Sequence, residues 1–352
     1  EAATKDNTFV LQTLGREGLR QAFSMAAQKV RGTGDIGKIL MPTYGWPMLD
    51  SQLQREGLRA VPYNILTPYC LKDEINEKLT QRSWPSNKFV AYYTNSPHNA
   101  TGRHITTEEH ADVNSVLPEN ILAIHDNPYF MACESGEKGQ KSNLKTGYGA
   151  LRADAKTPWI HVMSGSKALA TANTGLTVVV VHPSLVKDFS AQLLESTGLS
   201  YVPEFMANVG AAFHPDNDAE MLAHFSILRE KYARNRNALI GVFTDNVIQP
   251  PGGVNMTSLV RLFKEEVLGK TYTRYDGQKM TTKDGNDVVE AFANGVDDAS
   301  KGVVVVNNGV DENGHLLIRI AQAQHAEQFE EGVSRLEYGV DVLRNAPGLA
   351  IA

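Results

Sequence analysis

The chain has 352 residues, 42% of them apolar and 21% charged, which is typical of a globular protein with room for one large and one smaller core. A formal net charge of -6, without a basic run, argues against nucleic acid or an anionic membrane surface as the main partner. The two cysteines lack metal-ligand spacing, which argues against a disulfide scaffold and a structural metal site.

No apolar stretch of the sequence is long enough to span a bilayer, and nothing at its start resembles a signal sequence. We therefore expect a cytoplasmic protein in a reducing compartment. The sequence begins at Glu1 without a methionine, so we expect its first residues to be missing or processed away.

Short runs rich in β-branched and aromatic residues alternate with amphipathic segments from residue 8 to 182. This alternation predicts an α/β large domain over residues 1–240, with a mainly parallel seven-stranded sheet between helices. The predicted strands are 9–14, 38–41, 60–63, 89–94, 121–126, 159–163 and 176–182. The predicted helices are one that begins after Gly15, then 48–57, 71–80 and 106–116.

Beyond residue 183 the segments become longer and more helical. Residues 218–244 are predicted to form a helix that links two domains, with a buried stripe of Met221, Leu222, Phe225, Leu228 and Tyr232. Residues 241–352 are predicted to form a smaller α/β domain, with strands and a helix at 303–306, 316–320 and 326–344. The stretch 271–298, rich in Gly, Asp, Lys and Thr, is expected to be a surface excursion.

Four short motifs follow one another in a particular order: Pro-His-Asn-Ala-Thr-Gly at 97–102, Asp-Asn-Pro-Tyr at 126–129, Ser-Gly-Ser-Lys at 164–167 and Ile-Arg-Ile at 318–320. A lysine at the end of a strand is able to anchor an aldehyde cofactor covalently. The ordered set resembles the fold-type-I aminotransferases, the class I and II members of the aspartate aminotransferase superfamily, which use pyridoxal 5′-phosphate (PLP). The resemblance covers residues 9–345.

Gly15, Arg16 and Glu17 lie between a predicted strand and a predicted helix, where backbone N–H groups and the helix dipole favour an anion. A plain strand-to-helix turn is the alternative interpretation, whereas the resemblance implies the phosphate-binding turn. Ser164 and Ser166 are expected to donate hydrogen bonds to the same phosphate.

The predicted catalytic residues are Lys167, Asp126 and Tyr129. Lys167 is expected to form a Schiff base with PLP and then to move a proton at the substrate α-carbon. Asp126 ends an apolar strand, and a carboxylate against the PLP ring nitrogen keeps that nitrogen protonated and the ring an electron sink. The resemblance pairs Asp126 with Tyr129, whose phenol would bind the 3′-oxygen of PLP. A strand-end turn residue and a core tyrosine are the alternative.

Three further contacts are implied by the resemblance. Tyr44 is expected to stack on the PLP ring, with Trp46 as a competitor for that role. Asn99 is expected to bind the 3′-oxygen of PLP and the substrate. Arg319 is expected to clamp the substrate α-carboxylate through its planar guanidinium, the alternative being a surface arginine on an edge strand.

The chain departs from the family pattern at three places. Ala100 stands where the family has a proline, and Gly175 where an arginine usually pairs with the phosphate. Either Arg16 or another residue compensates the phosphate charge, or the chain is a divergent member. The family's further N-terminal segment, which contributes to the partner subunit's active site, is also expected to be missing here.

We expect a PLP-dependent aminotransferase that transfers the amino group of an α-amino acid to a 2-oxo acid and acts as a homodimer. One alternative is β- or γ-elimination or replacement on the same scaffold, because these reactions begin with the same linkage and deprotonation. The other is a non-catalytic aminotransferase-like sensor domain, which would need an attached helix-turn-helix that this sequence does not provide.

Overall fold

The computed structural model describes residues 3–11, 13–67, 70–81, 88–129, 155–168, 175–197, 214–249 and 256–348. The chain divides into two compact units. The first consists of Glu1–Asn99, Arg103–Ser226 and Pro251–Gly253, and the second of Ala100–Gly102, Ile227–Pro250 and Val254–Ala352. The division falls inside helix α8 (Asp218–Phe243), and the domain boundary predicted after residue 240 lies further along the same helix.

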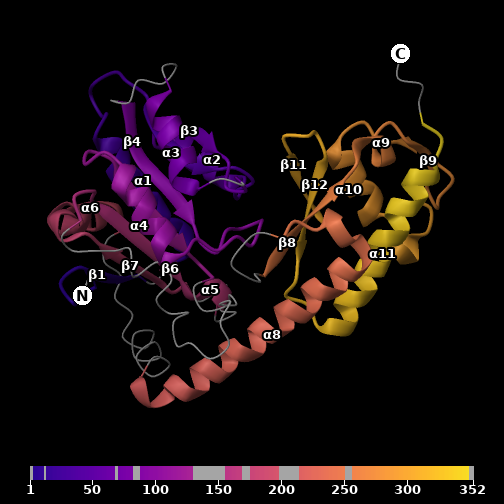
Figure 1. The fold of residues 1–352 in the computed structure, drawn as a ribbon. Coiled ribbons are helices and arrows are strands. Elements are labelled where there is room, and N and C mark those ends of the chain that lie inside the picture. Colours follow the sequence, from indigo (N-terminus) through magenta and orange to yellow (C-terminus); the bar gives the residue numbers. More distant parts are fainter. Residues whose placement is uncertain are drawn as a thin grey trace. The chain divides into compact units, whose positions relative to one another are not determined.

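A seven-stranded sheet, with the strand order β1-β7-β6-β5-β4-β2-β3, forms the centre of the first unit (Figure 1). Its strands are β1 (Thr8–Leu11), β2 (Gly37–Pro42), β3 (Leu58–Tyr63), β4 (Phe89–Asn95), β5 (Leu122–Asn127), β6 (Trp159–Ser164) and β7 (Thr177–Val181). Strands β3, β2, β4, β5 and β6 run parallel to one another. Strand β7 pairs antiparallel with β6, and β1 pairs antiparallel with β7 and so runs in the same direction as the five parallel strands. The predicted α/β class with a mainly parallel seven-stranded sheet is confirmed.

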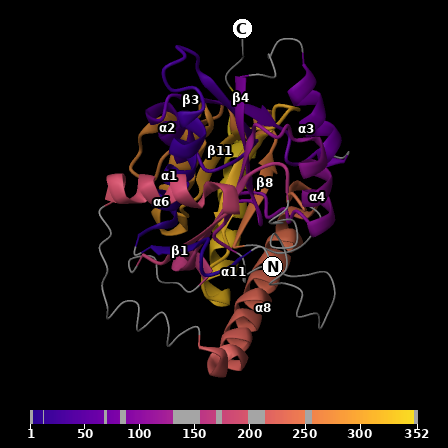
Figure 2. The same cartoon turned by 90° about the vertical axis from the view of Figure 1, so that its left-hand side faces the viewer.

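Helices cover both faces of this sheet (Figure 2). One face packs against α1 (Gly15–Gln28), α2 (Met48–Arg55) and α6 (Val186–Thr197), and the other against α3 (Leu71–Thr80) and α4 (Thr107–Val116). Successive side chains of a strand point to opposite faces, so Tyr93 belongs to the core beneath α1 and Tyr92 to the core beneath α3. Every residue of β4 is buried, as expected for a strand covered on both faces.

The second unit has a three-stranded antiparallel sheet of β11 (Val306–Val310), β12 (Leu316–Ala321) and β8 (Thr257–Leu262), with β12 in the centre. Its core joins this sheet to the C-terminal part of α8, to α10 (Gly285–Ala293) and to α11 (Ala326–Asn345). The smaller elements are α9 (Lys264–Val267), the hairpin β9 (Thr271–Thr273) and β10 (Lys279–Thr281), and 3₁₀ turns at Thr244–Asn246 and Ala299–Lys301. Two more 3₁₀ turns, Pro183–Leu185 and Pro215–Asn217, belong to the first unit.

The expectation for residues 271–298 was wrong. This stretch forms β9, β10 and α10, and α10 buries Val288, Ala291 and Phe292. The polar composition of this stretch was misinterpreted as that of a loop, because two of its acidic residues, Asp284 and Asp287, form the capping box that begins α10. Local polarity here marks a helix start and not an exposed loop.

Two finer predictions were wrong as well. The strand expected at 303–306 begins only at Val306, because Val304 is 85% exposed and lies outside the sheet. In the predicted stripe of α8, Phe225 and Tyr232 are buried, but Leu222 is 40% exposed. In the part of the chain that the structure covers, no helix combines the length and the apolar character needed to cross a membrane.

Candidate active site

The carboxyl ends of three neighbouring parallel strands bring polar side chains together. Asn95 ends β4, Asp126 is the last residue but one of β5, and Ser164 ends β6. Asn95 and Asp126 are register partners across the sheet. Because open α/β sheets bind ligands at this edge, the edge is the candidate active site.

Asp126 is held by two residues of the neighbouring strand. The Tyr93 hydroxyl donates to Asp126 Oδ2 at 2.7 Å, and Asn95 Nδ2 donates to the same oxygen at 3.2 Å. Asn95 Nδ2 also lies 3.1 Å from the Asp126 carbonyl oxygen. The carboxylate therefore has a defined orientation within the first unit.

Burial controls the charge of this carboxylate. It raises the pKa of Asp126 to about 7, although the hydrogen bond from Tyr93 acts in the opposite direction. Burial also raises the pKa of Tyr93 well above 10, with Asp126 and Tyr129 among the smaller causes. Tyr93 is therefore a permanent donor, and a positive group beside Asp126 would favour its ionised form.

Asn95 connects Asp126 with a second predicted site residue. Its Oδ1 accepts the Asn99 backbone N–H at 2.7 Å, while its Nδ2 contacts Asp126. Tyr129 is buried and follows the end of β5 by two residues. The structure thus brings Asn99 and Asp126 together through one amide.

The start of α1 lies against the end of β6. A Cβ atom at Gly15 would lie 2.8 Å from Ser164 Cβ, so only glycine fits without movement of its neighbour. The predicted phosphate turn and one of the predicted serines are therefore adjacent. Lys167 is exposed on α5 (Gly165–Ala168), the short helix that follows β6 directly, and the Ser166 side chain lies outside the described part.

The two residues after Gly15 have different surroundings. The Glu17 carboxylate accepts hydrogen bonds from Arg20 Nε at 2.9 Å and Gln21 Nε2 at 2.8 Å, and its N–H donates to the Leu14 carbonyl oxygen at 2.8 Å. Arg16 is exposed. Of the two, only the Arg16 side chain lies on the surface, and the assignment of both to the phosphate stays a prediction.

Gly175 has a backbone that explains why the expected arginine is missing. Its φ of +61° is in the left-handed region, and a Cβ there would lie 3.1 Å from the Thr13 backbone. Thr177 Oγ1 fixes the same contact by donating to the Thr13 carbonyl oxygen at 2.8 Å. A side chain at this position would be strained by both the conformation and the close backbone.

Tyr44 and Trp46 follow β2 but pack against different cores. Tyr44 is half-buried against the core on the α3 and α4 side, and Trp46 packs against the core on the α1 side. Tyr44 also has a φ of 62°, which is uncommon for a residue with a side chain. Such outliers cluster at ligand sites, so Tyr44 remains the predicted stacking residue.

Arg319 lies in the second unit, on β12. Its register partners are Val306 and Leu259, one on each neighbouring strand, so the alternative of an edge-strand arginine was wrong. Its assignment to the substrate carboxylate stays a prediction.

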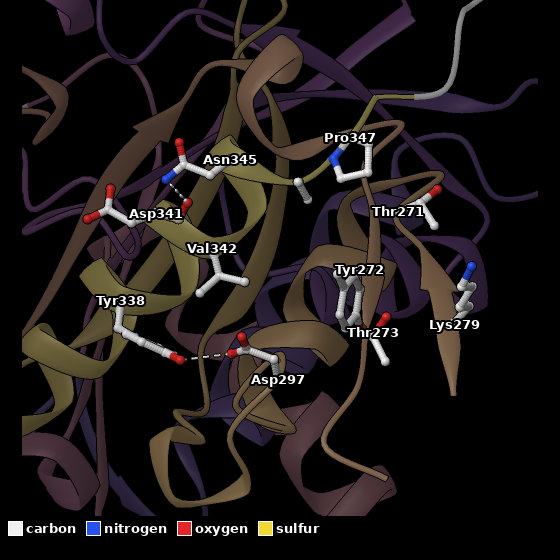
Figure 3. A pocket seen from close by; sticks show the side chains of 11 residues that line it. Thr271, Tyr272, Thr273, Lys279, Asp297, Tyr338, Asp341, Val342, Asn345 and Pro347 are labelled. Carbon is white, nitrogen blue, oxygen red and sulfur yellow. Dashed lines mark hydrogen bonds between the residues drawn. The ribbon is translucent and has the colours of Figure 1, made fainter. Parts of the chain in front are cut away.

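A cavity of about 610 Å³ lies elsewhere in the second unit, between the β9–β10 hairpin and the end of α11 (Figure 3). None of the predicted site residues is among the described residues that line it. Of its two carboxylates, Asp297 accepts a hydrogen bond from the Tyr338 hydroxyl at 2.9 Å and Asp341 one from Arg344 Nη1 at 2.9 Å. Both charges are thus already stabilised within the protein.

A row of buried histidines lies behind Asp126, on the opposite face of the sheet. His125 and His161 are register partners with ring centroids 6.3 Å apart, and His110 of α4 lies 5.1 Å from His125. Burial lowers the pKa of both His125 and His161 to about 3 and that of His110 well below its usual value. This layer is therefore polar and uncharged at neutral pH.

Two residues of the site were missed by the sequence analysis, Tyr93 and Asn95. Both point to the same face of β4 because they are separated by one residue. A polar residue at the end of a buried strand, two positions after a tyrosine, was the available signal.

The comparisons with known proteins agree with this fold. The model of the aminotransferase class I and II family matches residues 2–266, so the chain belongs to this family of fold-type-I transferases, whose members use PLP. A comparison with curated proteins found no match.

Solved structures of aminotransferases have the same fold. A mutant aspartate aminotransferase of Thermus thermophilus is 17% identical with a TM-score of 0.69, over 96% of this chain and 81% of that one. An aminotransferase from Mycobacterium tuberculosis is 19% identical with a TM-score of 0.68, over 95% and 76% of the two chains. An aromatic aminotransferase from Pyrococcus horikoshii is 18% identical with a TM-score of 0.68, over 96% and 80%.

Proposed function

We propose that the chain is a PLP-dependent aminotransferase that transfers the amino group of an α-amino acid to a 2-oxo acid. The observation that carries this proposal is the half-buried Asp126 carboxylate at the carboxyl end of β5, in register with Asn95 and with a raised pKa. Family membership supports the reaction class, since the matched family consists of transferases of this kind.

The residues at the sheet edge fit PLP. The half-buried Asp126 carboxyl group has a raised pKa, so a positive partner favours its ionised form, and a protonated ring nitrogen is such a partner. The start of α1, with Gly15 against Ser164, offers backbone N–H groups and a hydroxyl to a phosphate. When bound, PLP supplies an electron sink for negative charge at the substrate α-carbon.

Each predicted residue then has a defined role. Asp126 holds the proton on the ring nitrogen, and Asn99 and Tyr129 bind the 3′-oxygen. Tyr44 stacks on the ring, while the turn of Gly15, Arg16 and Glu17 holds the phosphate together with Ser164 and Ser166. Glu17 belongs to this turn through its backbone and not through its carboxylate, which Arg20 and Gln21 already hold. Lys167 anchors PLP and moves the proton at the substrate α-carbon, and Arg319 binds the α-carboxylate.

Labelling of Lys167 tests the proposal. The protein is incubated with PLP, reduced with borohydride and mapped by peptide mass spectrometry, with Lys167→Ala as the control. We expect a pyridoxyl group on Lys167 and none in the variant, which should fold but lose nearly all turnover. A label on a different lysine would contradict the assignment.

A panel of amino acids with PLP then separates the reaction types. A 2-oxo acid with pyridoxamine phosphate indicates transamination, whereas ammonia release indicates elimination. A cytoplasmic homodimer is part of the proposal, and light scattering of the purified protein measures its mass.

A further inference from the structure

Tyr93 has a fixed position next to the candidate active site. Its side chain is 1% exposed, and its ring centroid lies 5.8 Å from that of Phe23 on α1. Its carbonyl oxygen accepts the Tyr63 hydroxyl at 3.1 Å. Packing from α1 and a hydrogen bond from β3 therefore hold the residue whose hydroxyl reaches Asp126 at 2.7 Å.

The Asp126 carboxylate accepts hydrogen bonds from its neighbours through one of its two oxygens. Among the described residues, both side-chain hydrogen bonds to the carboxylate go to Oδ2, from Tyr93 and Asn95. Asn95 is itself fixed, because its Oδ1 accepts the Asn99 N–H at 2.7 Å. Oδ1 of Asp126 is thus the oxygen that remains for a ligand.

We propose that Tyr93 is a positioning residue, whose hydroxyl holds Asp126 Oδ2, presents Oδ1 to the ring nitrogen of PLP and stabilises the ionised carboxylate. This proposal rests on the proposed function, because it assigns Asp126 to the ring nitrogen. Tyr93 touches neither substrate nor cofactor in this role and acts through Asp126.

A phenol suits this role better than a cationic donor would. A hydrogen bond to the charged form of a carboxyl group favours ionisation and opposes the effect of burial. A lysine or arginine would also favour ionisation, but its charge would neutralise the carboxylate and weaken the attraction for a protonated ring nitrogen. The neutral Tyr93 hydroxyl leaves the negative charge of Asp126 to the ligand.

Tyr93→Phe tests this role because it removes the hydroxyl and keeps the ring. Tyr92→Phe is the matched control. Tyr92 directly precedes Tyr93 in the same strand and is fully buried. It belongs to the core on the other face, and its ring centroid lies 5.7 Å from that of Tyr63. Tyr93→Met removes the hydroxyl in a flexible apolar side chain and replaces Tyr93→Phe if that variant does not fold.

The first measurement uses the ligand-free protein. Carbon-13 NMR follows the titration of the Asp126 carboxyl group, identified by the signal that Asp126→Asn lacks. A hydrogen bond to a charged group shifts a protonation equilibrium by about tenfold or more, so the pKa of Asp126 should rise by about one unit in Tyr93→Phe. It should not change in Tyr92→Phe. An unchanged Asp126 titration in the Tyr93 variants would overturn the proposal.

The second measurement uses the PLP-loaded enzyme. We expect the acid limb of its kcat profile to move to higher pH in Tyr93→Phe and to stay in place in Tyr92→Phe. A purely structural tyrosine would change stability without moving this limb, and that result would refute the role. The two proposals fail in different ways. If Lys167 is not labelled by PLP, the proposed function fails, and with it the link between Tyr93 and PLP. A shifted NMR titration in Tyr93→Phe would even then establish that Tyr93 controls the ionisation of Asp126.

Discussion

Acid should destabilise the first unit through the row of buried histidines. His125 and His161 have pKa values of about 3 in the folded protein, against 6.5 when exposed. The unfolded chain therefore binds more protons below pH 6.5, and stability is lost as the pH falls from 6.5 toward 3. Each histidine should lower the free energy of unfolding by about 1.4 kcal/mol per pH unit in that window.

Asp126 acts in the opposite direction over much of the same range. Its pKa of about 7 exceeds the ordinary 3.8, so the folded state binds the extra proton between those values and gains stability as the pH falls. The pH slope of the wild-type unfolding free energy is therefore the contribution of the histidines minus that of Asp126. Removal of one histidine isolates the contribution of that histidine to the slope.

His161→Leu is the informative variant, because it removes the titrating ring and leaves an apolar side chain in a buried position. The pH slope of the unfolding free energy should become shallower by about 1.4 kcal/mol per unit between about pH 4 and 5.5, where the unfolded histidine is protonated and the folded one is not. Leu194→Gln, at an exposed position of α6 in the same unit, is the control and should leave the slope unchanged because it removes no titrating group.

Urea unfolding followed by tryptophan fluorescence measures this slope. All three tryptophans belong to the first unit, so the signal reports that unit and not the second. Equal slopes for the wild type and His161→Leu would refute the reasoning, because they would mean that His161 titrates in the folded state as it does in water.

Three further predictions concern the candidate active site. Asp126→Asn should stabilise the ligand-free protein above pH 7 by up to about 4 kcal/mol in urea unfolding, because the folded pKa of Asp126, about 7, lies well above 3.8. The same variant should slow single-turnover proton transfer. A variant less stable than the wild type above pH 7 would contradict this reasoning. Gly175→Arg should lower stability by more than the roughly 1–2 kcal/mol of a left-handed residue and should not improve PLP affinity. Its control is Gly57→Ala, where φ is +71° and nothing lies near. Arg319→Ala should raise KM for α-amino acids by an amount that corresponds to a loss of about 2–5 kcal/mol of binding free energy, without weakening PLP binding. Arg319→Lys should recover part of this loss. Unchanged KM values in both variants would place the carboxylate site elsewhere.

The sequence was sufficient for the sheet because each strand of the first unit is a compact apolar run with a clear break on both sides. All seven predicted strands are present, with ends shifted by three residues or fewer. The same reasoning failed at residues 303–306, where Val304 and Val306 are exposed although Val305 is buried. Apolar composition shows which residues favour a strand, but burial depends on neighbours that are distant in the sequence.

The candidate site was only partly predictable for a related reason. Asp126 and Ser164 were found because they lie at the ends of apolar strands, and Gly15 because it lies where a strand gives way to a helix, of which it is the first residue. Tyr93 was missed because its role depends on the register of β4 against β5, which a single sequence does not give. The reason why position 175 requires glycine was likewise not visible in the local sequence, because it is the positive φ angle of the backbone there.

The conformation of Gly175 also constrains how this branch of the family evolves. A glycine codon becomes an arginine codon by a single base change, so the usual phosphate-binding arginine is always one mutation away. That mutation meets a left-handed backbone against Thr13 and is costly before any benefit arises. The loop would first have to change its path, so an arginine is hard to gain at this position, and lineages that carry this glycine should retain it.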